Sequence, residues 1–300
     1  MRIRETFVFK FFREYLSKLH VLIDAEGEID RYYYQAFNKH SNLKDPQDLI
    51  EKIYWMELHS DTTHWTLCAD KYRVREYIES LGLLQYMPKL YGKWDKASDV
   101  NFEQLPESFV IKSNNGCATV KIVKDKSILD QKKLRKTLWQ WLHLPFGYQN
   151  CQLHYTKIKP CIIAEELLVN DYFDISPASL VDFKVYCING EPQFIWVAYN
   201  RINMHVHVQC FDTSWTPRPE YLKNGMSHYV YDPSDKIISK PKCLDELLDV
   251  ARKVSAPFPQ VRADFYIVNG KPIIGELTFT QGYGFLTYDV YERLGKMIEL

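Results

Sequence analysis

The sequence has no net charge, because 38 lysines and arginines balance 38 aspartates and glutamates, and its pI is near 7.1. A chain of this kind has no overall basic field that would attract nucleic acid, so we expect no nucleic-acid partner. No apolar run approaches the ~18–20 residues that span a bilayer. The first residues do not read as a secretory signal, because Lys10, Arg13 and Glu14 interrupt the segment that would have to be apolar. We therefore expect a cytoplasmic protein.

Paired cysteines are also missing. The seven cysteines are scattered, their number is odd, and no C-x-x-C pair occurs. A disulfide framework is therefore not expected, and zinc-ligand spacing is absent. Free, mostly buried thiols in a reducing compartment fit this pattern. The phosphate-binding pattern G-x-x-x-x-G-K-[ST] and the dinucleotide-binding glycine fingerprint are missing as well.

The residues that are present are those of a globular protein. Hydrophobic residues make up 46% of the chain and charged residues 25%, which excludes a mostly disordered or fibrous protein. Aromatic residues reach 15%, with 21 tyrosines, which suits large clefts or wide contact surfaces. A chain of 300 residues forms one large domain or two to three small ones.

The start of the chain is locally basic. Cationic and apolar residues are interleaved there: Arg2, Ile3, Arg4, Phe7, Phe9, Lys10, Phe11, Phe12, Arg13 and Lys18. One interpretation is peripheral membrane contact through a basic amphipathic helix. A helix packed on the rest of the protein explains the pattern equally well.

From Met1 to about Gly92 the hydrophobic pattern is helical. One helix is predicted from Asp48 to Met56, after the start signal of Pro46. A second is predicted from about Ala69 to Leu84.

From about Ser108 the pattern changes to short strands. Strands are predicted at 109–112, 120–123 and 161–164, and helices at about 129–142 and 244–254. Two hairpins follow the same logic, 182–188 with 193–198 around Asn189-Gly190, and 261–268 with 273–279 around Asn269-Gly270. Helices that alternate with antiparallel hairpins indicate an α+β protein of small lobes and not a doubly wound parallel sheet. We expect a helical region over 1–95, a small lobe over 96–165 and a second lobe over 166–300.

The last hairpin carries a candidate metal site. Alternation puts Arg262 and Asp264 on one face of the first strand, and Glu276 and Thr278 on one face of the second. A two-residue Asn-Gly loop would set Asp264 opposite Gly275 and send Glu276 to the wrong face. We therefore predict a loop with an odd number of residues, which brings the two acids to the same side.

Two carboxylates held that close repel each other unless a cation lies between them. Oxygen ligands without histidine or cysteine favour magnesium, with phosphate oxygens and water as its other ligands. Arg262 beside them would suit a transferring phosphoryl group. The alternative is a solvated strand face on which Arg262 pairs with Asp264.

Several other polar residues are weaker candidates. Lys112 ends a strand before the turn 113–116, whose backbone amides could hold phosphate, although any hairpin with an Asn-Gly tip looks similar. An apolar strand runs into Glu165 and Glu166, which could contact adenine or be solvated acids. Asp182 and Lys184 share one strand face. His205 and His207 also share a face, but no third metal ligand is evident.

Taken in order, these features resemble the ATP-grasp superfamily. The local sequence motifs resemble those of the TupA-like ATP-grasp proteins, which are named for teichuronopeptide synthesis. The matching stretches are 69–77, 105–112, 154–166, 182–190 and 261–280. The resemblance implies an ATP-grasp fold, in which two small α+β lobes clamp ATP, preceded here by the helical region.

The resemblance also implies a role for each residue. Lys71 and Lys112 would contact the α- and β-phosphates of ATP, and Lys184 would reach the phosphates. Glu165 would accept from the adenine amino group, with the Glu166 carbonyl and the Leu168 amide on the purine edge, and Asp182 would hold the ribose hydroxyls. Asp264 and Glu276 would bind magnesium, and Arg262 would stabilise the phosphoryl group. Thr278 stands where the superfamily usually has an asparagine at the metal, and the turn 114–118 and the loop 281–284 also depart from the usual pattern.

These roles imply an ATP-dependent carboxylate–amine ligase that forms an amide through an acylphosphate. The family context suggests a bacterial surface-polysaccharide or capsule pathway, with an amino acid or amine joined to a uronic acid. Two alternatives remain, a kinase on the same scaffold that phosphorylates a glycan hydroxyl, and a non-catalytic nucleotide-binding partner of glycosyltransferases.

Overall fold

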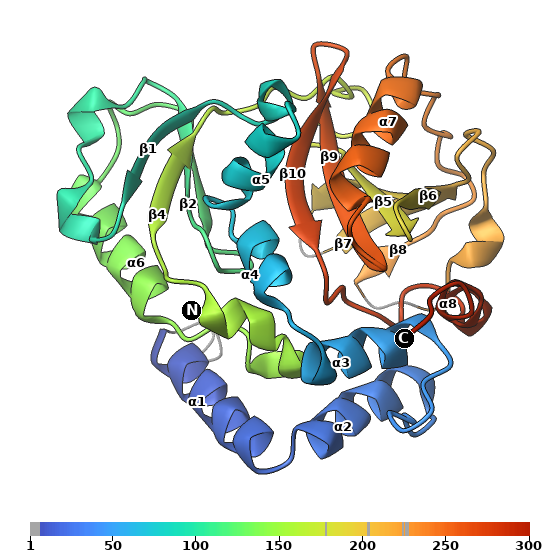
Figure 1. Cartoon of the computed structure of the whole chain (residues 1–300). Helices are drawn as coiled ribbons and strands as arrows, with labels where there is room; N and C mark the ends of the chain where they lie inside the picture. Colours follow the sequence, from blue (N-terminus) through green and yellow to red (C-terminus); the bar gives the residue numbers. More distant parts are fainter. Residues whose placement is uncertain (1–6, 178, 203–204, 224, 226–227) are drawn as a thin grey trace. The chain divides into compact units, whose positions relative to one another are not determined.

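The structure is a computed structural model that describes residues 7–177, 179–202, 205–223, 225 and 228–300 (Figure 1). The chain forms two compact units, and each draws on several stretches of the sequence. Unit 1 contains the described residues up to Tyr33 together with Ser60–Tyr77 and Pro88–Leu167. Unit 2 contains Tyr34–His59, Ile78–Met87 and the chain from Leu168 onward. The three consecutive regions expected from the sequence stay a prediction.

Unit 1 is built on a four-stranded antiparallel sheet with the strand order β1-β4-β2-β3 (Figure 1). Its strands are β1 (Leu90–Trp94), β2 (Phe109–Ser113), β3 (Val120–Val123) and β4 (Ile162–Glu165). Its helices are α1 (Phe7–Ile23), most of α2 (Ala25–Phe37), α4 (Thr63–Ala69), the first residues of α5 (Val74–Ser80) and α6 (Gln131–His143). In β2, Phe109 and Ile111 are buried against Leu138 of α6, whereas Lys112 is directed away from that core. Burial of this apolar face fixes which strand residues remain available for polar contacts.

Unit 2 is built on a six-stranded sheet with the order β10-β9-β5-β6-β7-β8. The strands are β5 (Asp182–Ile188), β6 (Glu191–Ile202), β7 (His205–Phe211), β8 (Tyr229–Val230), β9 (Gln260–Val268) and β10 (Lys271–Thr278). All neighbours pair antiparallel except β7 and β8. Helix α7 (Leu244–Ser255) packs on the sheet through Leu247, Ala251 and Val254, which are fully buried, and α3 (Leu49–His59) packs on α8 (Tyr288–Gly295). The β5–β6 and β9–β10 hairpins agree with the sequence prediction.

Two predictions about the first 95 residues are wrong. The stretch expected to be helical up to Gly92 contains β1, which is paired with β4. The single helix expected over 69–84 is broken at Asp70, whose carboxylate accepts from the backbone amides of Tyr72 (2.9 Å) and Arg73 (3.1 Å). A side chain that binds its own backbone in this way competes with helix continuation, so α5 begins only at Val74.

The basic start of the chain is described from Phe7 onward, and Arg2, Ile3 and Arg4 lie outside the described residues. In the part of the chain that the structure describes, none of the helices combines the length and the apolar character needed to cross a membrane.

Candidate functional site

The β9–β10 hairpin closes with a two-residue loop, so the predicted odd-numbered loop is wrong. Val268 is paired with Lys271, which leaves Asn269 and Gly270 as the loop. Both have left-handed backbone angles, with φ of 52° and 72°. Asn-Gly is the sequence that accepts two successive left-handed residues at the least cost, and such a turn matches the twist of the strands it joins.

The two acids nevertheless lie on the same side of the hairpin, because β10 contains a bulge. Ile274 is paired with Phe265 and Glu276 with Asp264, so Gly275 is one extra residue on β10. A β-bulge of this kind shifts the register by one and turns the following side chains to the other face. A Cβ atom at position 275 would lie 3.0 Å from the ring of Tyr266 and 3.3 Å from the Asp264 carbonyl, so glycine suits this position. Arg262 and Thr278 are paired two residues further along.

Asp264 is a buried carboxylate held by two cations. Lys184 of β5, directly opposite on the neighbouring strand, donates from Nζ to Oδ2 at 2.5 Å. Arg262 donates from Nε to Oδ1 at 2.7 Å and from Nη2 to Oδ2 at 2.8 Å. Burial by itself raises the pKa of Asp264, but the charges of Arg262 and Lys184 outweigh it and hold the pKa below its usual range. Asp264 is therefore ionised at neutral pH, as a metal ligand must be.

Glu276 and Thr278 complete this polar face. Arg262 Nη2 lies 3.8 Å from Glu276 Oε1 and donates to Thr278 Oγ1 at 3.2 Å. The Glu276 side chain is 38% exposed, whereas that of Asp264 is 4% exposed. Burial by itself lowers the pKa of the Arg262 guanidinium, but the neighbouring Asp264 carboxylate outweighs burial and raises this pKa well above the ordinary value. The face thus presents fixed positive charge beside two carboxylates.

The oxygen donors of this face fit magnesium. The described residues contain no group of three His, Cys, Asp or Glu side chains that could hold a metal ion by themselves. Asp264 and Glu276 are paired opposite each other and would supply two hard oxygen ligands. Asp264 accepts three hydrogen bonds, one fewer than its two oxygens can accept. Magnesium keeps several waters and takes the rest of its ligands from substrate phosphates, so two carboxylates suffice.

Asp182, predicted to bind ribose, lies on the same sheet. Its carboxylate is 4.0 Å from Lys184 Nζ and forms a close ion pair with Arg201. Arg201 was not predicted as a site residue. It follows an irregular stretch of β6 in which Asn200 has a φ of 47° and the pairing with β7 shifts. Strand alternation in the sequence gives no signal for this contact.

In unit 1, Glu165 is the centre of a second charged cluster. Lys112 Nζ lies 2.5 Å from Glu165 Oε2, and Arg75 Nη2 donates to Oε1 at 2.8 Å. Arg75 also donates to the Pro88 carbonyl at 2.6 Å. The structure thus brings together Lys112 and Glu165, both predicted, and adds Arg75. Arg75 lies within a stretch that carries the family resemblance, but only the tertiary structure reveals its partner, which is 90 residues away in the chain.

Lys71 is attached to the predicted phosphate turn. Its backbone amide donates to the Asn114 carbonyl and its Nζ to the Gly116 carbonyl, both at 3.0 Å. The start of the turn is tied to the segment before β4, because the side chain of buried Asn114 accepts from the Cys161 amide at 2.7 Å. Glycine suits position 116, since a Cβ atom there would lie 2.2 Å from the Thr119 hydroxyl. Lys71 is thus placed at the turn, as a phosphate contact requires.

Directly after Glu165, the backbone amide of Glu166 already donates a hydrogen bond within unit 1. The Glu166 amide donates to the Lys89 carbonyl at 2.9 Å and so extends the β1–β4 pairing by one residue. Leu168, predicted to offer its amide to adenine, is the first residue of unit 2 in this stretch.

Other features of the sequence lie outside these clusters. His207 Nδ1 is 2.6 Å from the Asp235 carboxylate, and His205 is exposed. Six of the seven cysteines are buried thiols, and Cys117 is exposed.

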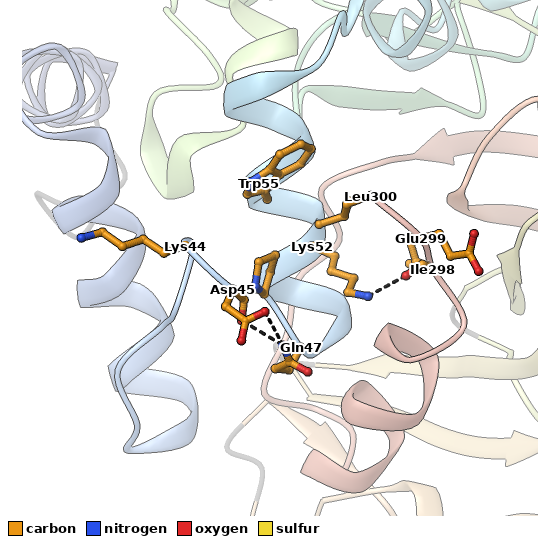
Figure 2. Close-up of a pocket in the computed structure, with 9 residues that line it drawn as sticks. Lys44, Asp45, Gln47, Lys52, Trp55, Ile298, Glu299 and Leu300 are labelled. Atoms are coloured by element: carbon orange, nitrogen blue, oxygen red, sulfur yellow. Dashed lines mark hydrogen bonds between the residues drawn. The ribbon is translucent and has the colours of Figure 1, made fainter.

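Unit 2 contains a cavity with a volume of about 620 Å³, which is lined by residues of α3, of the segment before α3 and of the chain end (Figure 2). In this cavity Lys52 donates to the Ile298 carbonyl at 2.6 Å. A cavity of unit 1, of about 410 Å³, is lined mainly by α1 and residues 142–160. No predicted site residue lines either cavity.

The chain is similar to solved ATP-grasp structures at low identity. The D-alanine–D-alanine ligase of Bacillus anthracis is 15% identical with a TM-score of 0.46, over 77% of this chain and 65% of that one. The Helicobacter pylori D-alanine–D-alanine ligase is 13% identical with a TM-score of 0.44, over 84% and 67%. The ATP-grasp ligase PsnB, complexed with a minimal precursor, is 13% identical with a TM-score of 0.39, over 78% and 59%. This chain thus spans less than two thirds of the length of the Bacillus anthracis enzyme and of PsnB.

No curated protein matches the chain. A sequence family does: the family described as TupA-like ATPgrasp matches residues 51–299, most of the chain and all of the polar clusters described above. The protein belongs to the TupA-like ATP-grasp family and has the ATP-grasp fold.

Proposed function

We propose that the protein is an ATP-dependent carboxylate–amine ligase that forms an amide through an acylphosphate. The observation that carries this proposal is the polar face of β5, β9 and β10, where two carboxylates stand opposite each other beside Lys184 and Arg262. Phosphoryl transfer needs little covalent help from a protein and depends on positioning and charge neutralisation, which this face offers.

The charged cluster and the turn of unit 1 are assigned to the nucleotide. Lys71 and Lys112 contact the α- and β-phosphates, and Glu165 accepts from the adenine amino group. Arg75 and Lys112 fix the position of the Glu165 carboxylate, which suits an acceptor. The Glu166 carbonyl and the Leu168 amide bind the purine edge, and Asp182 holds the ribose hydroxyls.

Asp264, Glu276 and the Thr278 hydroxyl are assigned to magnesium. The metal would neutralise charge on the β- and γ-phosphate oxygens and orient the γ-phosphoryl group. Lys184 reaches the phosphates, and Arg262 stabilises the phosphoryl group during transfer. Both cations are already fixed by Asp264, so little reorganisation is needed when ATP binds.

The reaction has two steps. An oxygen of the substrate carboxylate attacks the γ-phosphorus of ATP, the bond to the bridging oxygen breaks, and ADP leaves. The lone pair of the amine then attacks the acyl carbon, the bond from that carbon to the phosphate oxygen breaks, and inorganic phosphate leaves as the nitrogen loses a proton. ATP, the carboxylate and the amine thus give ADP, phosphate and the amide.

The substrates proposed are a uronic-acid-containing surface polysaccharide or its precursor and an amino acid or other amine. Membership of the TupA-like ATP-grasp family supports this class, together with the polysaccharide context that the resemblance implies. A glycan kinase would use the same face and would stop after transfer to a hydroxyl. A nucleotide-binding partner of glycosyltransferases would use the ATP clusters without chemistry.

The experiment is a turnover assay with ATP, magnesium, uronic-acid glycans and pools of amino acids, in which ADP, free phosphate and product mass are measured. The ligase gives ADP and phosphate only when both carboxylate and amine are present, with a product heavier than the glycan by the amine less one water. A phosphorylated product without free phosphate overturns the ligase in favour of the kinase. ATP binding without turnover overturns both enzymatic functions.

The metal assignment has its own variant. Glu276→Ala should abolish turnover, because it removes one of two facing carboxylates. Glu191→Ala, an exposed acid on β6 of the same sheet that pairs with Arg252, is the matched control and should retain turnover. Full activity of the Glu276→Ala variant would contradict the assignment of Glu276 to magnesium.

A further inference from the structure

Helix α1 is amphipathic in the reverse of the usual sense. The three buried residues of this helix are Glu14, Ser17 and Val21. Large apolar side chains face solvent instead, with exposed fractions of 40% to 84%: Val8, Phe12, Tyr15, Leu16, Leu19, Leu22 and Ile23. A surface helix normally turns its apolar stripe toward the core and its polar residues outward.

The exposed apolar residues form one continuous surface. At about 100° per residue, Leu22, Tyr15, Val8, Leu19, Phe12, Ile23 and Leu16 follow one another around the helix over an arc of about 120°. No polar side chain of α1 falls within this arc. We call these seven residues the apolar arc. This apolar surface is wider than the seam that a helix buries in a two-stranded coiled coil.

Both borders of the apolar arc carry positive charge. Lys18 lies on one side of it, and Arg13 lies on the other. The helix has one acidic residue, Glu14, which is 4% exposed and on the opposite face. Burial raises the pKa of Glu14, more than the Gln149 amide and Arg13 lower it. After α1 the described chain has two exposed acids, Asp24 before α2 and Glu26 in its first turn, and Asp24 accepts from the Gly27 amide at 2.8 Å.

A half-exposed tryptophan lies beside α1, next to Phe7, which is outside the apolar arc. The ring of Phe7 lies 6.1 Å from the ring of Trp139 on α6, and Trp139 is 50% exposed. Tryptophan with one face packed and one face in water is the side chain enriched at the boundary between lipid and water.

From these observations we propose that α1 binds in the plane of an anionic lipid surface, with the apolar arc among the acyl chains and Lys18 and Arg13 at the lipid phosphates. Apolar burial supplies the attraction, and the cationic borders select anionic over neutral lipid. Such a location would present the ligase to substrates that are themselves at a membrane. The proposal does not depend on the ligase activity, since it concerns residues outside the polar clusters.

The test is flotation of the full-length protein with vesicles of phosphatidylcholine alone or with phosphatidylglycerol added. We expect binding to the anionic vesicles and at least tenfold weaker binding to neutral ones. The double variant Phe12→Glu/Leu16→Glu should lower the partition into anionic vesicles at least tenfold, because two apolar side chains that would enter the lipid are replaced by charges. Arg13→Gln should lower it about fivefold, and more salt should weaken the wild type in the same direction.

Ile128→Glu is the matched control, because Ile128 is 82% exposed in unit 1 but lies outside α1, and it should bind vesicles like the wild type. Circular dichroism and thermal unfolding should be unchanged in all variants, since each altered side chain faces solvent. Equal binding of wild type and double variant overturns the proposal. A second outcome also overturns it: the wild type is a dimer by light scattering and binds no vesicles, and the double variant is a monomer. In that case a second copy of the chain would cover the apolar arc.

Discussion

Asp264 and Glu276 face each other across β9 and β10 because Gly275 adds one residue to β10. In an unbroken ladder after the Asn269-Gly270 turn, Asp264 would face Gly275, and Glu276 would point to the other side of the sheet. The bulge is therefore part of the proposed metal site, and a functional consequence of its geometry can be tested.

Gly275→Ala should impair magnesium use more than folding. The added methyl would lie 3.0 Å from the Tyr266 ring and 3.3 Å from the Asp264 carbonyl, so Glu276 would shift relative to Asp264. We expect turnover to fall about tenfold, partly recovered by excess magnesium, since a small misplacement at a reacting site has a large effect. Turnover should be measured against magnesium concentration, with urea unfolding as the control for stability. A wild-type magnesium dependence would contradict the role of the bulge.

Lys184→Met should destabilise unit 2 by about 2 kcal/mol, because Asp264 would stay buried with one of its two cations gone. Arg262 remains as a partner, which keeps the cost below that of an entirely unpaired buried charge. The urea midpoint at pH 7 measures the change. Lys223→Met, which removes an exposed lysine that donates to the Ala36 carbonyl, should cost less than about 1 kcal/mol. Equal midpoints for wild type and Lys184→Met would show that the pair is energetically neutral.

Arg75→Met should weaken ATP binding about tenfold, because Glu165 would lose the partner that fixes one of its oxygens. Calorimetric titration with ATP and magnesium checks this. Arg73→Met is the control from the same segment, because Arg73 pairs with Asp70 and not with Glu165. Equal losses of affinity in both variants would indicate a general disturbance of α5 and would remove Arg75 from the nucleotide site.

Asp212→Asn should destabilise the protein at neutral pH and not in acid. Burial opposes ionisation of Asp212, but hydrogen bonds from Ser214, Thr216 and Arg218 outweigh it and lower the pKa from 3.8 to about 2. A carboxyl with a lowered pKa stabilises the fold fully above its unfolded value, and this contribution is lost as pH falls through the folded value. We expect a loss of about 1–2 kcal/mol at pH 7 that shrinks below about pH 4 and vanishes near pH 2. Urea midpoints across this range test it, with Asp249→Asn on the surface as the control.

A difference in urea midpoint between Asp212→Asn and wild type that stayed constant down to pH 2 would contradict this prediction. The stabilising bonds to Asp212 would then not depend on its charge.

Much of the local structure could be predicted from the sequence. Alternation around Asn189-Gly190 and Asn269-Gly270 located both long hairpins of unit 2, because turn chemistry and strand period are properties of neighbouring residues. The helix expected over 69–84 failed for a local reason as well, since the Asp70 carboxylate captures the next amides. The hydrophobic pattern carried no sign of this competition.

The sequence by itself determined that Arg262, Asp264, Glu276 and Thr278 belong to one hairpin and that the chain resembles the ATP-grasp family. Only the tertiary structure decided how the acids come to face each other, through a bulge at Gly275 instead of an odd loop. It also decided which cations hold the carboxylates, Lys184 on Asp264 and Arg75 on Glu165, which are 80 and 90 residues apart in the chain. Turns and strands follow from contacts between near neighbours, whereas the compensation of a buried charge depends on which distant segments pack together.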